Sequence, residues 1–167
     1  MTMHGFYNDT TKDYYYDIAL IELEKEADIN NYVQTVPMVT SKKDTFNRHD
    51  ICYIAGWGNI IGSVFDIQMS DYLQQSRMTV LSLDECRATY GDGIIETQIC
   101  VQSHHSSACL GDSGSPLVCA SGQIWMLVGI ASWVGSSTCS PSYPSVYTRI
   151  SSFEHWVRSV MGQAEYY

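Results

Sequence analysis

Residues 108–119 of this chain read Ala-Cys-Leu-Gly-Asp-Ser-Gly-Ser-Pro-Leu-Val-Cys, and Ser113 stands at the centre of the stretch, between an aspartate and a glycine. A serine hydroxyl is a poor nucleophile unless a neighbouring base accepts its proton. The tetrahedral intermediate that forms when the serine attacks a carbonyl group also needs fixed N–H donors around its oxyanion. Glycines beside the serine allow the backbone to supply these donors. The stretch therefore predicts that Ser113 is the nucleophile of an acyl transfer on a peptide bond.

An acid that suits the same chemistry lies near the start of the chain. Asp17 stands in Tyr-Tyr-Tyr-Asp-Ile-Ala-Leu-Ile-Glu-Leu, residues 14–23, at the entry of an apolar run. A buried aspartate can orient a histidine and stabilise its charged form. No histidine stands in a recognisable base motif, and we interpret all five as solvated or structural: His4, His49, His104, His105 and His155. The sequence therefore supplies two members of a catalytic triad and lacks the third.

The composition predicts a folded chain that binds neither nucleic acid nor a membrane. With 167 residues, of which 45% are hydrophobic and 16% charged, the chain is long enough to form a hydrophobic core. Its net charge of -9 disfavours nucleic acid and anionic membranes, because both attract clustered Lys and Arg. No apolar run approaches the roughly 18 residues that cross a bilayer. Residues 1–13 lack the basic start and the apolar stretch of a secretory signal.

The cysteines predict disulfides rather than a metal site. Six are present, at positions 52, 86, 100, 109, 119 and 139, and their spacing is not that of a zinc site. His104 and His105 lie near Cys109, but one such cluster without a second pair gives only weak support for a metal. We therefore expect three disulfides, whose pairing the spacing leaves open, and neither a metal nor a cofactor.

Disulfides imply an oxidising compartment and hence secretion. The N-terminus shows no means of export, so we expect that an N-terminal segment is missing from this sequence. Asn8-Asp9-Thr10 is an acceptor sequence for N-linked glycosylation, which fits a surface loop of a secreted protein. Such tripeptides also arise often by chance.

Short apolar runs between glycine and serine clusters predict an antiparallel barrel. Residues 18–23 read as a buried strand, and residues 30–50 as a connector rich in turn-forming and charged residues. Later strands are expected at residues 51–55, 72–80, 116–119, 124–133 and 146–150. We expect a short helix to start within residues 82–86, and a terminal helix capped by Ser152 to bury apolar side chains at helical spacing.

Seven ordered motifs resemble the trypsin/chymotrypsin family of serine endopeptidases, most closely its chymotrypsin and pancreatic-elastase branch. Besides the two stretches quoted above, they are His4-Gly5-Phe6-Tyr7-Asn8, Cys52-Tyr53-Ile54-Ala55-Gly56-Trp57-Gly58, Ser132-Trp133, Pro144-Ser145-Val146-Tyr147-Thr148-Arg149 and Trp156-Val157. The resemblance implies an all-β, chymotrypsin-like fold in which the catalytic cleft lies between two antiparallel six-stranded barrels. It implies that residues 1–49 are a remnant of the first barrel and the interdomain connector, that residues 50–150 form the second barrel, and that residues 151–167 form a C-terminal helix and tail.

Carried over to this sequence, the resemblance assigns catalytic and structural roles to single residues. Ser113 is the nucleophile, Asp17 is the acid that holds a histidine in the correct tautomer, and the backbone N–H groups of Gly111 and Ser113 form the oxyanion hole. The implied disulfides are Cys52 with Cys119, Cys86 with Cys100, and Cys109 with Cys139.

The resemblance also suggests which substrates the chain prefers. It places Ser107 at the floor of the specificity pocket, where a neutral hydroxyl cannot stabilise a buried Lys or Arg. Val134 should shorten the pocket as in elastases, and Ser145 replaces another pocket glycine. The backbone from Ser132 through Trp133 to Val134 would pair with the substrate as an added strand. We therefore expect cleavage after medium apolar residues such as Leu, Met, Val or Ala.

Departures from the family pattern predict that the chain is almost inert by itself. The family's Ala-Ala-His-Cys segment, which carries the catalytic base, is absent. Asp112 would lack the N-terminal ammonium group that pairs with the matching acid in the family, so we expect its loop to be disordered or inactive-like. Ser115 replaces the second glycine of the family's Gly-Gly pair, which is a milder change.

We interpret the chain as part of a secreted, monomeric serine endopeptidase whose partners are protein or peptide substrates and protein inhibitors of proteases. One alternative is a non-catalytic binding module on a half-protease scaffold. Such a module would have to bury the strand edges that an absent barrel leaves open. A cytosolic interaction protein with reduced cysteines is a third and more distant interpretation.

Overall fold

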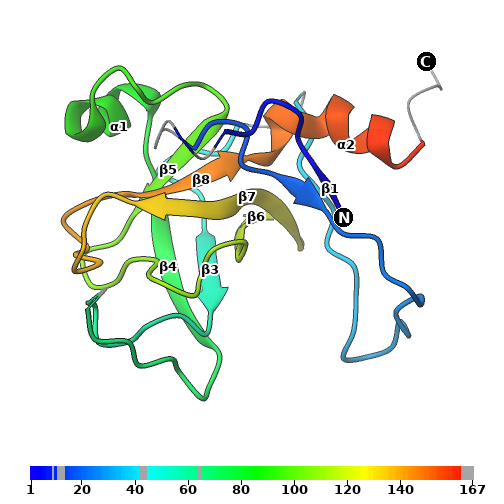
Figure 1. Ribbon diagram of the computed structural model, residues 1–167, viewed down its shortest axis with the longest axis horizontal. Coiled ribbons are helices and arrows are strands. Elements are labelled where there is room, and N and C mark those ends of the chain that lie inside the picture. The colour runs from blue at the N-terminus through cyan, green and yellow to red at the C-terminus, as the bar shows by residue number, and fades with distance from the viewer. Residues whose placement is uncertain (9, 11–13, 42–44, 64, 163–167) are drawn as a thin grey trace.

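The main body of the protein is a closed antiparallel barrel of six strands, in the order β3-β4-β5-β8-β7-β6 (Figure 1). The computed structural model describes residues 1–167 except 9, 11–13, 42–44, 64 and 163–167. The barrel strands are β3 Cys52–Gly56, β4 Gln74–Val80, β5 Gln98–Gln102, β6 Pro116–Ser121, β7 Ile124–Val134 and β8 Ser145–Arg149. With its second sheet and C-terminal helix, this architecture confirms the expected chymotrypsin-like fold.

The core fills the inside of this barrel. Leu117 on β6, Val128 on β7 and Tyr147 on β8 are completely buried. Buried and partly exposed residues alternate along much of β6 and β7, as expected of strands with one face on a core. In β5, four consecutive residues are buried. The sequence prediction missed β5, because a strand that is covered on both faces lacks the alternating pattern.

Three disulfides fasten the barrel and its loops. Cys52 faces Cys119 across the β3–β6 pair and is bonded to it. The other two bonds join Cys86 to Cys100 and Cys109 to Cys139. These are the pairings that the family resemblance implies, and no cysteine is left free.

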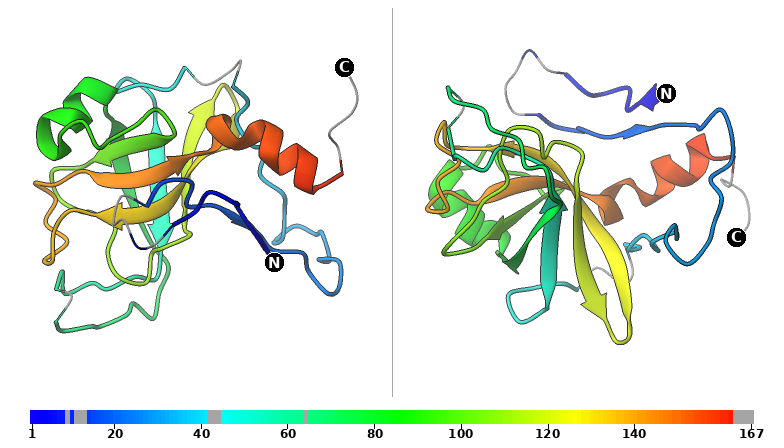
Figure 2. Two further views of the ribbon diagram at one scale, coloured as in Figure 1. Left: turned by 45° about the horizontal axis from the view of Figure 1, so that its top comes forward. Right: turned by 90° about the horizontal axis from the view of Figure 1, so that it is seen from below.

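The N-terminal segment forms a small separate sheet outside the barrel (Figures 1 and 2). Strand β1, Thr2–Met3, pairs antiparallel with β2, Ala19–Leu20. The predicted buried strand over residues 18–23 is therefore wrong in length and in burial, since Ile21 is 71% exposed and Leu23 63% exposed. Within the described residues, β2 pairs only with β1. No further strand therefore pairs along this segment to cover Ile21 and Leu23.

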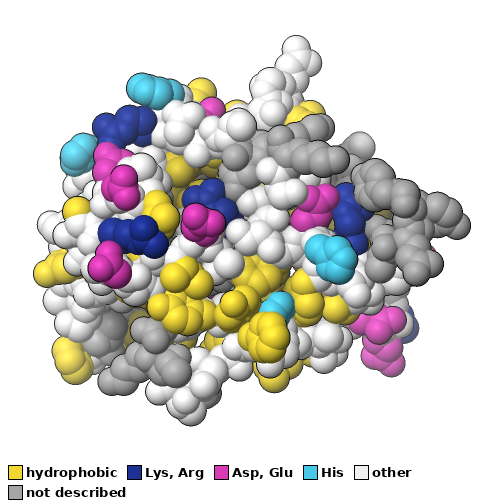
Figure 3. Space-filling model, turned by 90° about the horizontal axis from the view of Figure 1, so that it is seen from above, with side chains coloured by type: hydrophobic (Ala, Val, Ile, Leu, Met, Phe, Trp, Pro, Cys, Tyr) yellow, Lys and Arg dark blue, Asp and Glu magenta, His cyan; other side chains and the backbone are white. Residues whose placement is uncertain are grey.

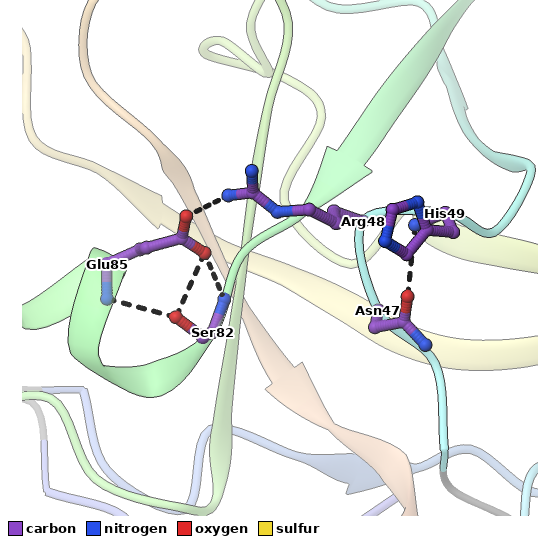
Figure 4. A network of polar contacts seen from close by, with 5 residues as sticks. All are labelled: Asn47, Arg48, His49, Ser82 and Glu85. Carbon is purple, nitrogen blue, oxygen red and sulfur yellow. Dashed lines mark hydrogen bonds and ion pairs between the residues drawn. The ribbon is translucent and has the colours of Figure 1, made fainter.

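The connector between this sheet and the barrel is anchored at several points along its length. Val39 is completely buried, and its N–H donates to the carbonyl oxygen of Leu127 on β7 at 3.0 Å. Farther along, Arg48 forms an ion pair with Glu85, a residue in the first turn of helix α1, Leu83–Tyr90 (Figure 4). The same glutamate closes a capping box with Ser82, so the helix start and the connector share one carboxylate.

The chain ends in a 3-10 turn, η2 Ile150–Phe153, which leads directly into helix α2, Glu154–Val160. The predicted cap at Ser152 is wrong. Because η2 is already helical at that residue, its hydroxyl donates instead to the carbonyl oxygen of Glu96 at 3.4 Å. Among the described residues, no helix is long and apolar enough to cross a membrane. On the face drawn in Figure 3, hydrophobic side chains gather in one band, and most charged side chains lie outside it.

Candidate active site

A cleft of about 1140 Å³ lies where the N-terminal segment meets the loops of the barrel. Asp17 and Ser113 both line it, although they lie far apart in the sequence. Ser132, Trp133 and Val134, at the end of β7, line the same cleft. The structure thus brings together five of the residues that the sequence singled out.

The loop that carries Ser113 is held by backbone hydrogen bonds. The N–H of Gly114 donates to the carbonyl oxygen of Ala131 on β7 at 2.9 Å, and a turn closes from Ser115 N–H to the carbonyl oxygen of Asp112 at 2.8 Å. Gly111 and Gly114 have φ angles of 91° and 82°, which other residues rarely adopt. The glycines on either side of Asp112-Ser113 are therefore required by the bend, which leaves Ser113 exposed in the cleft.

The two N–H groups expected to form an oxyanion hole are those of Gly111 and Ser113. Within the described part of the chain, neither group donates a hydrogen bond to the protein. The side chain of Met69 packs over Gly111 so closely that a Cβ at position 111 would lie 2.1 Å from its Cε atom. A side chain at position 111 would therefore have to displace the end of Met69, and the positive φ angle of Gly111 disfavours it as well.

The carboxylate of Asp112 has two backbone partners. One oxygen accepts from the N–H of Gly58 at 2.9 Å, and the other accepts from the N–H of Cys109 at 3.0 Å. Two backbone N–H groups bind this acid and its loop has a defined conformation, so the expectation of a disordered loop is wrong. The other expectation, an inactive-like loop without the ammonium group, stays a prediction. Burial, followed by the negative charge of Asp112, raises the pKa of Tyr147 above its usual value of 10.0.

The glycines of Gly56-Trp57-Gly58 leave the space that this carboxylate occupies. A Cβ at position 56 would lie 2.0 Å from Oδ1 of Asp112, and a Cβ at position 58 would lie 2.3 Å from Oδ2 of the same residue. The motif was recognised in the sequence, but its contact with Asp112 was not predicted. The sequence offered one signal of this contact. Two glycines separated by a single residue stand at the end of an expected strand, and glycine in such a place often marks the close approach of another group.

A buried asparagine supports the same loop from the other side. Asn59 donates its N–H to the carbonyl oxygen of Leu110 at 2.8 Å, next to Gly111. Its side chain accepts from the N–H groups of Ile61 and Gln68, so it also holds the turn that carries Met69 toward Gly111. Sequence reasoning missed this residue, because an isolated asparagine after a strand reads as an ordinary turn former.

Asp17 is fixed through its side chain and its backbone. Its Oδ2 accepts from the hydroxyl of Ser132 at 2.6 Å, and its carbonyl oxygen accepts from the hydroxyl of Thr148 at 2.7 Å. Its Oδ1 accepts no hydrogen bond from the described residues. Tyr14 and Tyr16, just before Asp17, have φ angles of 48° and 57°, so the chain bends sharply before the acid. The acid therefore has one carboxylate oxygen bound and one available.

All five histidines lie in described parts of the chain, and none lines the cleft. His4 stacks on Tyr16 with ring centroids 5.1 Å apart, and it also contacts Phe153 and Trp156. Burial lowers the pKa of His4 below its usual 6.5, and its Nδ1 accepts from the N–H of Phe6 at 3.3 Å. Both features favour a neutral, structural histidine. His105 lines a different cavity.

Val134, which the resemblance assigns to a wall of the specificity pocket, is the last residue of β7 and follows Trp133. Trp133 packs edge-on against Tyr90 with ring centroids 4.8 Å apart, and the hydroxyl of Tyr90 donates to the carbonyl oxygen of Pro144 at 2.5 Å. Val134 pairs in register with Ser145 on β8. Helix α1 and strand β8 therefore both support this wall.

Ser107 and Ser145 do not line the cleft themselves, although their chain neighbours Ala108 and Val146 do, and the two serines contact each other. Their hydroxyl oxygens are 3.0 Å apart, and the hydroxyl of Ser145 also accepts from the N–H of Ala108 at 3.1 Å. Ser107 lines a second cavity of about 420 Å³, which also borders Asp112, whereas Ser145 is buried and lines neither cavity. In the described residues, no cluster of three or more His, Cys, Asp or Glu side chains could hold a metal ion.

The family model described as Trypsin matches residues 1–157. The chain belongs to the trypsin family. This trypsin-family chain is 36% identical over 165 residues to the fibrinolytic enzyme, isozyme C, of Lumbricus rubellus, a match that covers 93% of the chain and 66% of that protein. It is 38% identical over 162 residues to trypsin I-P1 of Gallus gallus, with 95% and 60% covered.

A solved structure gives the same result. Neuropsin, a serine protease expressed in the limbic system of mouse brain, matches this trypsin-family chain with a TM-score of 0.83 at 29% identity. The match covers 96% of the chain and 69% of neuropsin. The chain thus spans less than two thirds of the length of the two sequence relatives and somewhat more of neuropsin.

Proposed function

We propose that the chain carries the nucleophile, the acid and the substrate cleft of a serine endopeptidase, and that the catalytic histidine comes from outside these 167 residues. The observation that carries this proposal is that Asp17 and Ser113 line one cleft. The free Oδ1 of Asp17 is suited to accept the Nδ1–H of an imidazole placed between the two residues.

In the proposed reaction, the imidazole takes the proton of Ser113 as its Oγ bonds to the carbonyl carbon of the substrate. The C–N bond of the peptide then breaks, and the imidazole gives the proton to the leaving amine. Water attacks the resulting ester, which frees the second product and restores the serine. The N–H groups of Gly111 and Ser113 would bind the oxyanion, since neither donates elsewhere in the described structure.

Without a base in the cleft, this chemistry stops at the first step. Removing the histidine from a Ser-His-Asp triad lowers kcat by about a millionfold in the peptidases where this has been measured. His4 is stacked on Tyr16 and no histidine lines the cleft, so the chain's own histidines offer no substitute. We therefore expect the isolated chain to be nearly inactive.

The cleft favours an extended, apolar substrate. Trp133 and Val134 pair with β8 on one side, whereas the pairing of β7 with β6 ends at Ile130. A substrate strand would add to this open edge, with its side chain before the scissile bond against Val134. The hydroxyls of Ser107 and Ser145 offer no negative charge to a Lys or Arg substrate. Cleavage after Leu, Met, Val or Ala fits these features.

The same edge would accept protein inhibitors of proteases, which also present an extended strand. Three disulfides suit an extracellular protein, so we place the chain outside the cell. We further propose that it acts as a monomer. A binding role without catalysis would leave the hydroxyl of Ser113 unreactive even after a base is supplied. The reactivity of Ser113 in the presence of a base therefore distinguishes a peptidase from a non-catalytic binding module.

The test is a chimera in which the segment of Gallus gallus trypsin I-P1 that bears the family's Ala-Ala-His-Cys motif is joined in front of this chain. A fluorophosphonate probe should label Ser113 in the chimera, as located by peptide mapping. The Ser113→Ala variant should show no labelling, and Asp17→Asn should label far more slowly. If a chimera with all three disulfides formed remains unlabelled at Ser113, the proposed function is wrong.

A further inference from the structure

The tripeptide Asn8-Asp9-Thr10 is a motif that the proposed peptidase activity does not use. It has the Asn-x-Thr pattern of N-linked glycosylation. It is also the only such pattern in the sequence, because the other four asparagines, Asn30, Asn31, Asn47 and Asn59, have neither Ser nor Thr two positions later. Since the pattern often arises by chance, its meaning depends on the structure around it.

The structure joins the two defining residues of the motif directly. The hydroxyl of Thr10 donates to Oδ1 of Asn8 at 2.7 Å, and the N–H of Thr10 donates to the same oxygen at 2.9 Å. An amide nitrogen is a weak nucleophile because its lone pair is shared with the carbonyl group. Two donors on the carbonyl oxygen fix the orientation of the carboxamide, and one of them is the hydroxyl that the acceptor pattern requires.

The position of Asn8 suits a bulky hydrophilic group. Asn8 and Thr10 are both exposed. Tyr7, the residue just before, lines the cleft and donates its N–H to the carbonyl oxygen of His4 at 3.0 Å. The backbone is therefore anchored immediately before the acceptor, and a group on Asn8 would stand at the rim of the cleft without displacing core residues.

We propose that Asn8 carries an N-linked oligosaccharide. In this step, Nδ2 of Asn8 bonds to the anomeric carbon of the first sugar, and the bond from that carbon to the pyrophosphate of a lipid-linked oligosaccharide donor breaks. The amide nitrogen loses one proton, and the lipid pyrophosphate is the leaving group. The step shares with the proposed function the passage of the chain through the secretory lumen, but it requires no catalysis by Ser113.

The test expresses the full chain behind a cleavable export leader in eukaryotic cells and treats the secreted product with peptide N-glycosidase. We expect one discrete mass decrease and conversion of the linked asparagine to aspartate at position 8. The variants Asn8→Gln and Thr10→Ala should lose the mass shift, whereas Thr10→Ser, which keeps a hydroxyl, should retain it. Asn31→Gln is the matched control and should leave the shift unchanged.

A secreted chain without a glycan at position 8 would overturn the proposal, and so would a mass shift that persists in Thr10→Ala. Titration of free thiols in the same material shows whether the three disulfides have formed, so a folding failure is recognised separately. Ser113→Ala should be glycosylated to the same extent as the unchanged chain. Because this variant lacks the proposed nucleophile, it tests glycosylation separately from the proposed peptidase activity.

Discussion

At the scale of single residues, the contact between Gly58 and Asp112 is the most sensitive feature of the site. Replacing Gly58 with Ala would place a Cβ 2.3 Å from a carboxylate oxygen, so the acid or the strand end must move. Such overpacking costs about 1–3 kcal/mol of unfolding free energy. Chemical denaturation measures the loss. Gly5→Ala is the control, since a Cβ at position 5 would meet no atom within 4 Å, and it should change stability by less than about 0.5 kcal/mol.

The Gly58 contact also shows how far single residues could be predicted from the sequence. Ser113 and Asp17 were found because each stands in a motif whose chemistry is readable, and the structure places both in one cleft. The partners of Asp112 were not found, because they are backbone N–H groups, and one of them comes from a distant strand end. The bond from Ser132 to Asp17 was missed for the same reason of distance.

At the scale of elements, Glu85 at the start of α1 makes two kinds of contact (Figure 4). It caps the helix together with Ser82, and it forms an ion pair with Arg48 of the connector. Ser82→Ala removes the acceptor for the N–H of Glu85 and should lower the free energy of unfolding by about 1 kcal/mol. Ser82→Thr keeps a capping hydroxyl and should cost much less. Arg48→Ala should cost under about 1 kcal/mol, because the ion pair is half exposed. If urea denaturation shows Arg48→Ala to be the more damaging change, the capping account is wrong.

The contact of the N-terminal segment with η2 and α2 should depend on pH through His4. Because burial lowers the pKa of His4, the folded state binds a proton less readily than the unfolded state. This packing is therefore at full strength above about pH 6.5 and weakens as pH falls from there toward the lower pKa of the folded state. Hydrogen exchange at residues 4–8 and 14–18 should accelerate between pH 7.5 and pH 5, after correction for the intrinsic rate, and His4→Phe should abolish this change. If protection from hydrogen exchange does not change with pH in the original chain, the proposed role of His4 is wrong.

Elements could be predicted where one face is buried and the ends are marked by turn residues. Strands β3, β6, β7 and β8 were predicted to within a few residues for this reason. Strand β5 was missed because its buried residues do not alternate with exposed ones, and because its apolar run, Ile99 to Val101, has Gln rather than turn formers at both ends. A strand was predicted at residues 18–23, but the observed strand covers only Ala19–Leu20. An apolar run forms a full strand only where another element pairs with it along its length.

At the scale of the whole molecule, the disulfides account for much of the stability of a barrel of this size. The bond between Cys86 and Cys100 closes a loop of 14 residues between α1 and β5. In the chain-entropy account, a loop of this length contributes about 3 kcal/mol. The double variant Cys86→Ser, Cys100→Ser should therefore lose about this much in thermal or chemical unfolding. A loss under about 1 kcal/mol would show that the unfolded chain is already restrained in this region.

The central claim at this scale is that the chain presents a nucleophile and an acid in one cleft without a base between them. The most direct measurement is the initial rate at which the purified 167-residue chain hydrolyses peptides with Leu, Met, Val or Ala before the reporter group. The account predicts a rate that cannot be distinguished from that of the Ser113→Ala variant. A rate typical of serine peptidases, lost in Ser113→Ala, would contradict it.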